Sequence, residues 1–337
     1  MNVSTNSISI VAVASVVLCS STLCADERPT AERTRQAVDR GLVFLQVDAD
    51  KWRSERQCAT CHHGTLTVLA LAEAKQRGLS VDANKFADFV TWTKERLSKI
   101  DQPRDSRPGW SMVNTPAIYF GLLTQFVPAQ DVVSPEELQT IRGHLLRHQE
   151  DNGAWAWSSA PPVNRPPPFF ESDEVATLLA LLTFPAEGEL THDDLRAGRQ
   201  KAIDWLSKAD ETDTTQTAVL RMLWKKRKDP ALDLQPQIER FLNRQRSDGG
   251  FAQVADRTSD AYATGQSLYV LNLLGVPNDR PEVQRAVEYL VVTQREDGSW
   301  PMTRRGHDGV TPSAYVVPIT YFGSAWGTLG LMRSALK

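Results

Sequence analysis

The chain has 337 residues, 41% of them hydrophobic, so it can bury a large core as one big domain or two small ones. Its formal net charge of -3 and its isoelectric point of about 6.1 give no excess of basic groups that would favour binding to nucleic acid. We therefore expect no nucleic-acid partner.

The first 25 residues resemble an export signal. From Ile8 to Cys19 the sequence carries no charge, the small-residue stretch SSTLCA follows, and the first charged side chain is Asp26. This pattern predicts a secretory signal that is cleaved near Ala25, although no Lys or Arg precedes the apolar run. The protein would then be periplasmic or secreted, with residues 26–337 as a single domain. A membrane is a partner only if the segment stays uncleaved as an anchor.

Residues 57–66 read QCATCHHGTL and hold two of the four cysteines and two of the six histidines of the chain. C-x-x-C-H is the attachment signature of c-type haem, in which Cys58 and Cys61 bond the haem and His62 binds the iron. Three alternatives stay open: a Cys58–Cys61 disulfide, a zinc site that includes His62 or His63, and a chance match without a cofactor. We expect haem c first, and zinc or no cofactor otherwise.

A repeated pattern organises the rest of the chain. Arg, an apolar or aromatic residue and Gln recur at the predicted helix ends around Gln46, Gln149, Gln245 and Gln294, and Gly with Trp or Phe follows the last three. The last two glutamines lie about 49 residues apart and the earlier intervals are about twice as long, so six units fit the chain. We expect Gln to cap backbone groups, Gly to turn the chain, and the aromatic residue to pack between units.

Each unit contains two helical patterns. The first is amphipathic, as in RAVEYLVVTQ, and its start signals include a capping box from Ser134 to Glu137. The second is apolar almost all round, as in EVATLLALLTF, and is typical of a buried helix. The sequence therefore predicts an outer ring of amphipathic helices around an inner ring of buried ones. The predicted inner helices are residues 60–76, 113–127, 171–184, 212–226, 258–274 and 318–336.

Over about residues 30–337 these repeats resemble the QW repeats of squalene-hopene cyclases and prenyltransferase β-subunits. The resemblance implies an all-α fold, the (α/α)6 toroid of six helical hairpins in two concentric rings, and a small hydrophobic ligand of isoprenoid type. The cyclases of this family protonate their substrate with a DxDD motif. The nearest stretch here, ETDTT at 211–215, keeps Asp213 but has Thr214 where the last Asp belongs. No cysteine follows Cys61 to serve as the zinc ligand that the prenyltransferases use.

Three acidic residues near the starts of predicted inner helices are weak catalytic candidates: Asp173, Asp213 and Asp260. Because hairpins alternate in direction, we expect them at the pole of the toroid that also carries the cysteine pair. Helix capping is the alternative role, since Asp is a preferred N-cap residue. His144 and His148, spaced i, i+4, suit a metal ion, but the sequence shows no third ligand, so we expect a surface or interface role.

The expected sixth ligand of the haem iron is Met112 in GWSMVN, because Met opposite His raises a haem potential into an electron-transfer range. Met302 and His307 are the alternatives. The first function that we expect is therefore an exported haem c protein that passes electrons to a redox partner protein. The second is an enzyme that acts on an isoprenoid or, by fold analogy alone, on a polysaccharide, and the third is a binding scaffold without chemistry. The enzyme predicts a deep apolar, aromatic-lined cavity with carboxylates at its end, whereas the haem protein predicts an open polar slot above His62.

Overall fold

The computed structural model describes residues 31–56, 62–95, 97–101, 114–126, 132–157, 168, 171–185, 192–209, 212–300, 302, 305 and 313–336. Within these ranges it contains twelve α-helices, one 3-10 turn (η1, Leu97–Lys99) and a single isolated bridge between Ala252 and Ser259 in place of strands. The predicted all-α class is confirmed. Among the described helices none is both long and apolar enough to span a membrane. The predicted export signal lies outside the described residues.

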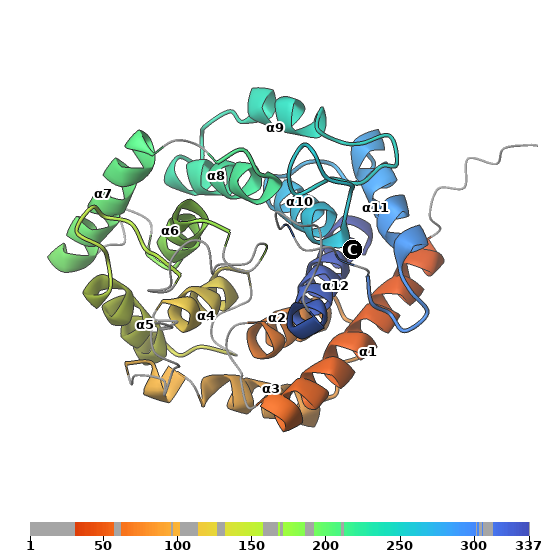
Figure 1. The fold of residues 1–337 in the computed structure, drawn as a ribbon, viewed down its shortest axis with the longest axis horizontal. Helices are drawn as coiled ribbons and strands as arrows, with labels where there is room; N and C mark the ends of the chain where they lie inside the picture. The colour runs from red at the N-terminus through yellow and green to blue at the C-terminus, as the bar shows by residue number, and fades with distance from the viewer. Residues whose placement is uncertain are drawn as a thin grey trace, which may run out of the picture.

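The helices alternate along the chain between an outer and an inner ring, and Figure 1 shows both rings end-on. All six predicted inner helices are present, with ends that differ by a few residues. The predicted toroid of six hairpins is therefore confirmed. The outer helices are α1 (Ala31–Arg56), α3 (Ala83–Lys94), α5 (Pro135–Arg147), α7 (Asp193–Lys208), α9 (Gln235–Leu242) and α11 (Pro281–Thr293). The inner helices are α2 (His63–Gln76), α4 (Thr115–Phe126), α6 (Asp173–Leu182), α8 (Thr215–Lys228), α10 (Ala261–Leu273) and α12 (Ser313–Ala335).

The two rings differ in how much of each helix is buried. In the inner helix α10 every residue from Ala261 to Leu271 is buried, because the helix contacts the outer ring on one side and its inner neighbours on the others. In the outer helix α11 only the stripe Val283, Ala286, Val287 and Leu290 is buried. This is the apolar face that the helical periodicity predicts.

The repeated glutamines join each unit to the next. Gln149, Gln245 and Gln294 each donate from the side-chain amide to a carbonyl in their own turn and to a carbonyl in the following outer helix. For Gln294 the two acceptors are Gly298 O at 3.0 Å and Ala37 O at 2.8 Å. Because Ala37 lies in α1, this bond links the last unit to the first and closes the ring. The predicted capping role of Gln is confirmed.

The repeated Gly turns the chain as predicted, whereas the repeated Trp300 does not pack between units as predicted. Gly298 has a φ of 86°, and a Cβ at this position would lie 2.3 Å from Arg40 O in α1, so only Gly fits the turn. Trp300 is 1% exposed and donates from its indole nitrogen to Leu290 O at 2.8 Å. The ring therefore packs inside its unit and satisfies one carbonyl near the end of α11.

The first copy of the pattern is an exception. Gln46 does not lie at a helix end but inside α1, where its side-chain amide donates to Leu42 O at 2.9 Å. The prediction of a helix end at Gln46 is therefore wrong. The physical reason is visible in the sequence, since no Gly follows Gln46 to turn the chain and α1 continues to Arg56.

A buried charged cluster joins three inner helices across the place where the ring closes. Glu73 of α2 is 1% exposed and accepts hydrogen bonds from the Tyr269 hydroxyl of α10 and from the Arg333 guanidinium of α12, both at 2.5 Å. The Arg333 guanidinium also lies 4.5 Å from the centre of the Tyr269 ring. A buried carboxylate is stable only when it is paired in this way, so the cluster specifies how α2, α10 and α12 meet.

Candidate functional site

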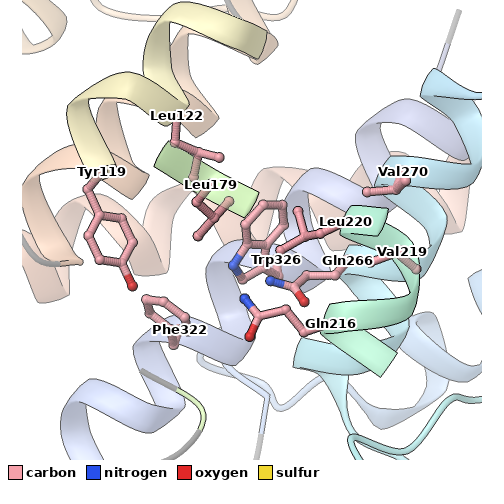
Figure 2. Close-up of a pocket in the computed structure, with 10 residues that line it drawn as sticks. All are labelled: Tyr119, Leu122, Leu179, Gln216, Val219, Leu220, Gln266, Val270, Phe322 and Trp326. Carbon is pink, nitrogen blue, oxygen red and sulfur yellow. The ribbon is translucent and has the colours of Figure 1, made fainter. Parts of the chain in front are cut away.

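An apolar pocket lies inside the inner ring, where α4, α6, α8, α10 and α12 face one another (Figure 2). Its empty volume is about 400 Å³, which includes space that is open to solvent. Three aromatic side chains, Tyr119, Phe322 and Trp326, form part of the wall. The aliphatic part of the wall is Leu122, Leu179, Val219, Leu220 and Val270. Such a lining suits an apolar ligand, because most of what a ligand would contact is hydrocarbon or ring surface.

Few polar groups reach this pocket. They are the Tyr119 hydroxyl, the amides of Gln216 and Gln266, and the indole nitrogen of Trp326, and Figure 2 shows the two amides near the indole. Gln216 Oε1, Gln266 Oε1 and Trp326 Nε1 are buried and form no hydrogen bond in the structure. A buried polar atom without a partner costs free energy, so these atoms are available to a ligand with a polar group.

Two buried carboxylates lie at the pole where α6, α8 and α10 begin. Glu171, which precedes α6, is 3% exposed in its side chain and forms an ion pair with Arg305 at 2.8 Å. It also accepts a hydrogen bond from the Thr214 hydroxyl. Asp260, 6% exposed, caps α10 and accepts a hydrogen bond from the Gln253 amide at 2.6 Å. We call Glu171, Asp260 and Arg305 the acidic cluster.

Tyr262 connects the acidic cluster to the pocket. Its ring stacks on Phe322, a pocket residue, with 5.4 Å between ring centres. Burial raises the pKa of the Tyr262 hydroxyl well above its ordinary value, and the negative charge of Glu171 adds to the increase. Tyr262 therefore lies between Glu171, whose charge acts on its hydroxyl, and the pocket residue Phe322.

The pKa values of both carboxyl groups are raised. Burial raises the pKa of Asp260 to about 6, against the lowering effect of its hydrogen bonds and of Arg305. Burial also raises the pKa of Glu171, although Arg305 and the Thr214 hydroxyl oppose it. A buried carboxyl group with a pKa near 6 can hold or release a proton close to neutral pH, which is a property of acid–base groups.

The three acidic residues that the sequence suggests as catalytic candidates lie in different environments. Asp260 is buried and caps its helix, as the capping alternative predicts. Asp213 is 76% exposed in its side chain and pairs with Arg244 at 2.8 Å, so it is not placed as an internal acid. Asp173 begins α6 and is half-buried. The caps of α6 and α8 are Ser172 and Thr214, so the capping prediction for Asp173 and Asp213 is wrong.

Sequence reasoning missed Glu171 and Arg305. The stretch FFESD places two carboxylates, Glu171 and Asp173, within three residues at the start of α6, and spacing alone does not tell which one points inward. In the structure the residue before the Ser172 cap, Glu171, is the buried one, because the chain is still extended there and has not entered the helix. Arg305 lies outside the repeated pattern, so no periodic signal marks it.

The described part of the predicted haem site is a close aromatic cluster at the start of α2. The ring of His63 stacks between Trp52 and Tyr321, with centre distances of 4.4 and 3.7 Å, and its Nε2 lies 2.9 Å from Asp48 Oδ2. His62 is 6% exposed, its Nδ1 contacts the Nδ1 of His63, and its ring packs edge-on against Trp52. Burial lowers the pKa of both imidazoles well below their ordinary value, which keeps them neutral.

A neutral imidazole is what a metal or haem iron requires. The ring of His62 packs against those of Trp52 and His63. Cys58, Cys61, Met112 and His307 lie outside the described residues. Met302 packs against α12, where a Cβ on Gly323 would lie 2.5 Å from the Met302 sulfur. Haem c at Cys58, Cys61 and His62 therefore stays a prediction from the sequence, as does zinc.

No protein family model matches the chain, and no curated protein matches it in sequence. Its similarity is to solved structures. The type II terpene cyclase MstE from Scytonema has a TM-score of 0.54 at 17% identity, over 90% of this chain and 99% of that one. A protein from Actinoplanes has a TM-score of 0.54 at 15% identity, over 90% and 100%. A polysaccharide lyase has a TM-score of 0.52 at 12% identity, over 90% and 97%. At these identities the likeness establishes the fold alone: the chain is a terpenoid cyclase-like α/α toroid over nearly its whole length.

Proposed function

We propose that this protein binds an isoprenoid-class molecule in the pocket of the inner ring and stabilises positive charge that develops on it. The lining of the pocket carries this proposal. Aliphatic and aromatic side chains form most of the wall, and only Tyr119, Gln216, Gln266 and the Trp326 indole offer hydrogen bonds. A saccharide has a hydroxyl on almost every carbon and would leave most of them without a partner here. The toroid fold is shared by a terpene cyclase and a polysaccharide lyase, and the pocket favours the former.

The charges around the pocket support the second part of the proposal. The faces of Tyr119, Phe322 and Trp326 carry the negative part of an aromatic quadrupole, which attracts a cation. When both carboxyl groups of the acidic cluster are ionised, two negative charges face one Arg305, so the cluster has an excess of negative charge next to an apolar space. A fixed negative charge in a water-poor site stabilises a positive charge more than water does.

Within this function Asp260 is the proposed proton-transfer group. Its pKa of about 6 means that the carboxyl group is partly protonated just below neutral pH and partly ionised above it. The cyclase motif residue that the sequence retains, Asp213, is exposed and paired with Arg244, which argues against the same role for it.

A binding and turnover experiment tests this function. The full-length protein is titrated with geranylgeraniol and, separately, with an uronic-acid oligosaccharide, and reaction mixtures are extracted for mass spectrometry. We expect binding of the isoprenoid only. Trp326→Ala should weaken it at least about tenfold, which corresponds to about 1.4 kcal/mol. Trp205→Ala in the outer helix α7 is the control and should bind as the wild type does.

The outcomes separate the two parts of the proposal. If the wild type binds the oligosaccharide and not the isoprenoid, the proposed ligand class is wrong. If the wild type converts the isoprenoid and Asp260→Asn converts it equally well, the ligand class stands and the role of Asp260 is wrong. Asn is a good N-cap residue, so this variant keeps the cap of α10 while it removes the titrating group.

Export and a bound haem c or zinc at Cys58, Cys61 and His62 form a second proposal. The observation that favours it is the neutral, buried pair His62 and His63 directly after the cysteine pair in the chain. A redox partner protein belongs to this proposal and not to the first.

A further inference from the structure

Three side chains with metal-binding atoms meet on the outer surface of the toroid. His144 lies in the last turn of α5, His148 directly follows that helix, and Asp101 follows η1. One ligand atom from each residue lies within 4.8 Å of the other two. His144 is 1% exposed, whereas Asp101 and His148 are exposed. The sequence places the two histidines on one helix face, and the tertiary structure supplies the third group.

Hydrogen bonds already hold this cluster together. His144 Nδ1 lies 2.6 Å from Asp101 Oδ1, and Arg147 donates to Asp101 Oδ2 at 2.7 Å. The rings of His144 and His148 lie 4.5 Å apart between their centres. The carboxylate therefore fixes the orientation of the buried imidazole, and the exposed imidazole stands next to it.

We propose that Asp101, His144 and His148 bind a divalent transition-metal ion, with Zn²⁺ as the first candidate. Two imidazoles and one carboxylate are a ligand set that zinc uses, whereas Mg²⁺ and Ca²⁺ prefer oxygen ligands alone. Three protein ligands leave one tetrahedral position for water. The exposed side of the cluster, formed by Asp101 and His148, is where that water would enter.

The distances fit this proposal with small side-chain movements. In a tetrahedral zinc site with bonds of about 2.1 Å the ligand atoms lie about 3.4 Å apart. The cluster brackets this value, since one pair lies at 2.6 Å and all atoms lie within 4.8 Å of one another. Asp101 and His148 are exposed and can rotate, while the packed His144 stays in place.

Two features of the cluster affect its affinity for a metal ion in opposite ways: the positive charge of Arg147 and the pKa of His148. Arg147 is a positive neighbour that now pairs with Asp101, and its side chain is 57% exposed, so it can turn into water when a metal takes the carboxylate. The pKa of His148 is lowered by burial first and by His144 and Arg147 as well, although Asp101 opposes this. A lowered pKa favours the neutral imidazole, which is the form that binds a metal.

Metal binding would tie the segment after η1 to α5. Asp101 lies in the second hairpin of the ring, between α3 and α4, and both histidines belong to the third hairpin. A ligand that binds only the folded state stabilises it by mass action, so the melting temperature should rise with the zinc concentration.

The test is calorimetric titration of metal-free, full-length protein with ZnCl₂, beside thermal unfolding with and without zinc. The variants are His148→Ala and Asp101→Ala, and His192→Ala is the control, since His192 is an exposed histidine at the start of α7. We expect each of the two cluster variants to bind one zinc ion fewer than the wild type, or to bind that ion at least about 100-fold more weakly. Loss of a group that only supports a metal ligand already lowers metal affinity about 10–100-fold, and these variants lose a ligand itself. The control should behave as the wild type does.

A second metal distinguishes this cluster from the cysteine pair. Co²⁺ bound by thiolate gives intense charge-transfer absorption in the near ultraviolet, whereas Co²⁺ bound by nitrogen and oxygen gives only weak visible bands. We expect His148→Ala to remove the weak visible bands and to leave any charge-transfer band unchanged. If wild type and His148→Ala bind the same number of zinc ions with the same affinity, the proposal is overturned. It is also overturned if the wild type binds no zinc, or only zinc whose Co²⁺ substitute shows thiolate absorption.

Discussion

The close contact between α10 and α12 decides whether a Gly→Ala substitution in α10 stabilises or destabilises the protein. A Cβ on Gly265 of α10 would lie 2.2 Å from Trp326 O and 2.3 Å from Trp326 C in α12. On the other helix, a Cβ on Gly330 of α12 would lie 2.6 Å from Gly265 O. The two helices therefore touch backbone to backbone, beside the pocket that Gln266 and Trp326 line. We predict that Gly265→Ala destabilises the protein.

The magnitude follows from these distances. Carbon atoms in contact lie about 3.5 Å apart, so the new methyl group is more than about 1 Å too close to backbone atoms, which cannot rotate away. Added groups in a packed core typically cost about 1–3 kcal/mol. Ala is the better helix former by about 0.8–1 kcal/mol, but in a helix held this tightly the clash outweighs that gain. We expect the free energy of unfolding to fall by about 1–3 kcal/mol.

Gly143→Ala is the matched control. Gly143 lies in the outer helix α5, and a Cβ there would meet only the end of the flexible Arg147 side chain, at 3.3 Å. The same substitution should therefore stabilise the protein by up to about 1 kcal/mol through helix propensity. Urea unfolding followed by circular dichroism measures both changes. If Gly265→Ala is as stable as the wild type, the backbone contact of α10 and α12 is not as close as described here.

Three further predictions concern single groups. Glu73→Ala should cost about 3–5 kcal/mol in urea unfolding, because it leaves the largely buried Arg333 guanidinium without its carboxylate. Arg333→Met in the same chain should restore part of the loss, and no loss would mean that the pair is not buried. Because the pKa of Asp260 is raised from 3.8 to about 6, its contribution to stability is present below about pH 4 and is lost as the pH rises through 6. The stability of Asp260→Asn relative to the wild type should therefore rise between pH 4 and 7, by at most about 3 kcal/mol, whereas parallel pH profiles would refute the raised pKa. Wild-type protein made in a host that assembles c-type haem should keep a Soret band after denaturation, and the Cys58→Ala, Cys61→Ala double variant should lack the band. A wild type without the band would contradict haem attachment. Metal analysis of the protein would then test for zinc.

The candidate site was only partly predictable. The sequence selected Asp260 from its place before an apolar helix, and the structure buries it. The same rule selected Asp213, which the fold leaves 76% exposed. Both residues stand near a helix start, and the sequence does not show which side of the loop faces the interior. Glu171 and Arg305 belong to segments far apart in the chain, so only the closed ring brings them to 2.8 Å.

What the sequence determined by itself is the repeated part of the molecule. The period of about 49 residues, the amphipathic and apolar helices, and the roles of Gln294 and Gly298 follow from local patterns, because Gln149, Gln245 and Gln294 make the same contact with the next unit. What only the tertiary structure decided is everything that joins non-equivalent segments. The pocket between five inner helices, the acidic cluster and the meeting of Asp101 with His144 and His148 depend on the path of loops that do not repeat. A periodic pattern carries no information about such loops, since their contacts form only after the ring has closed.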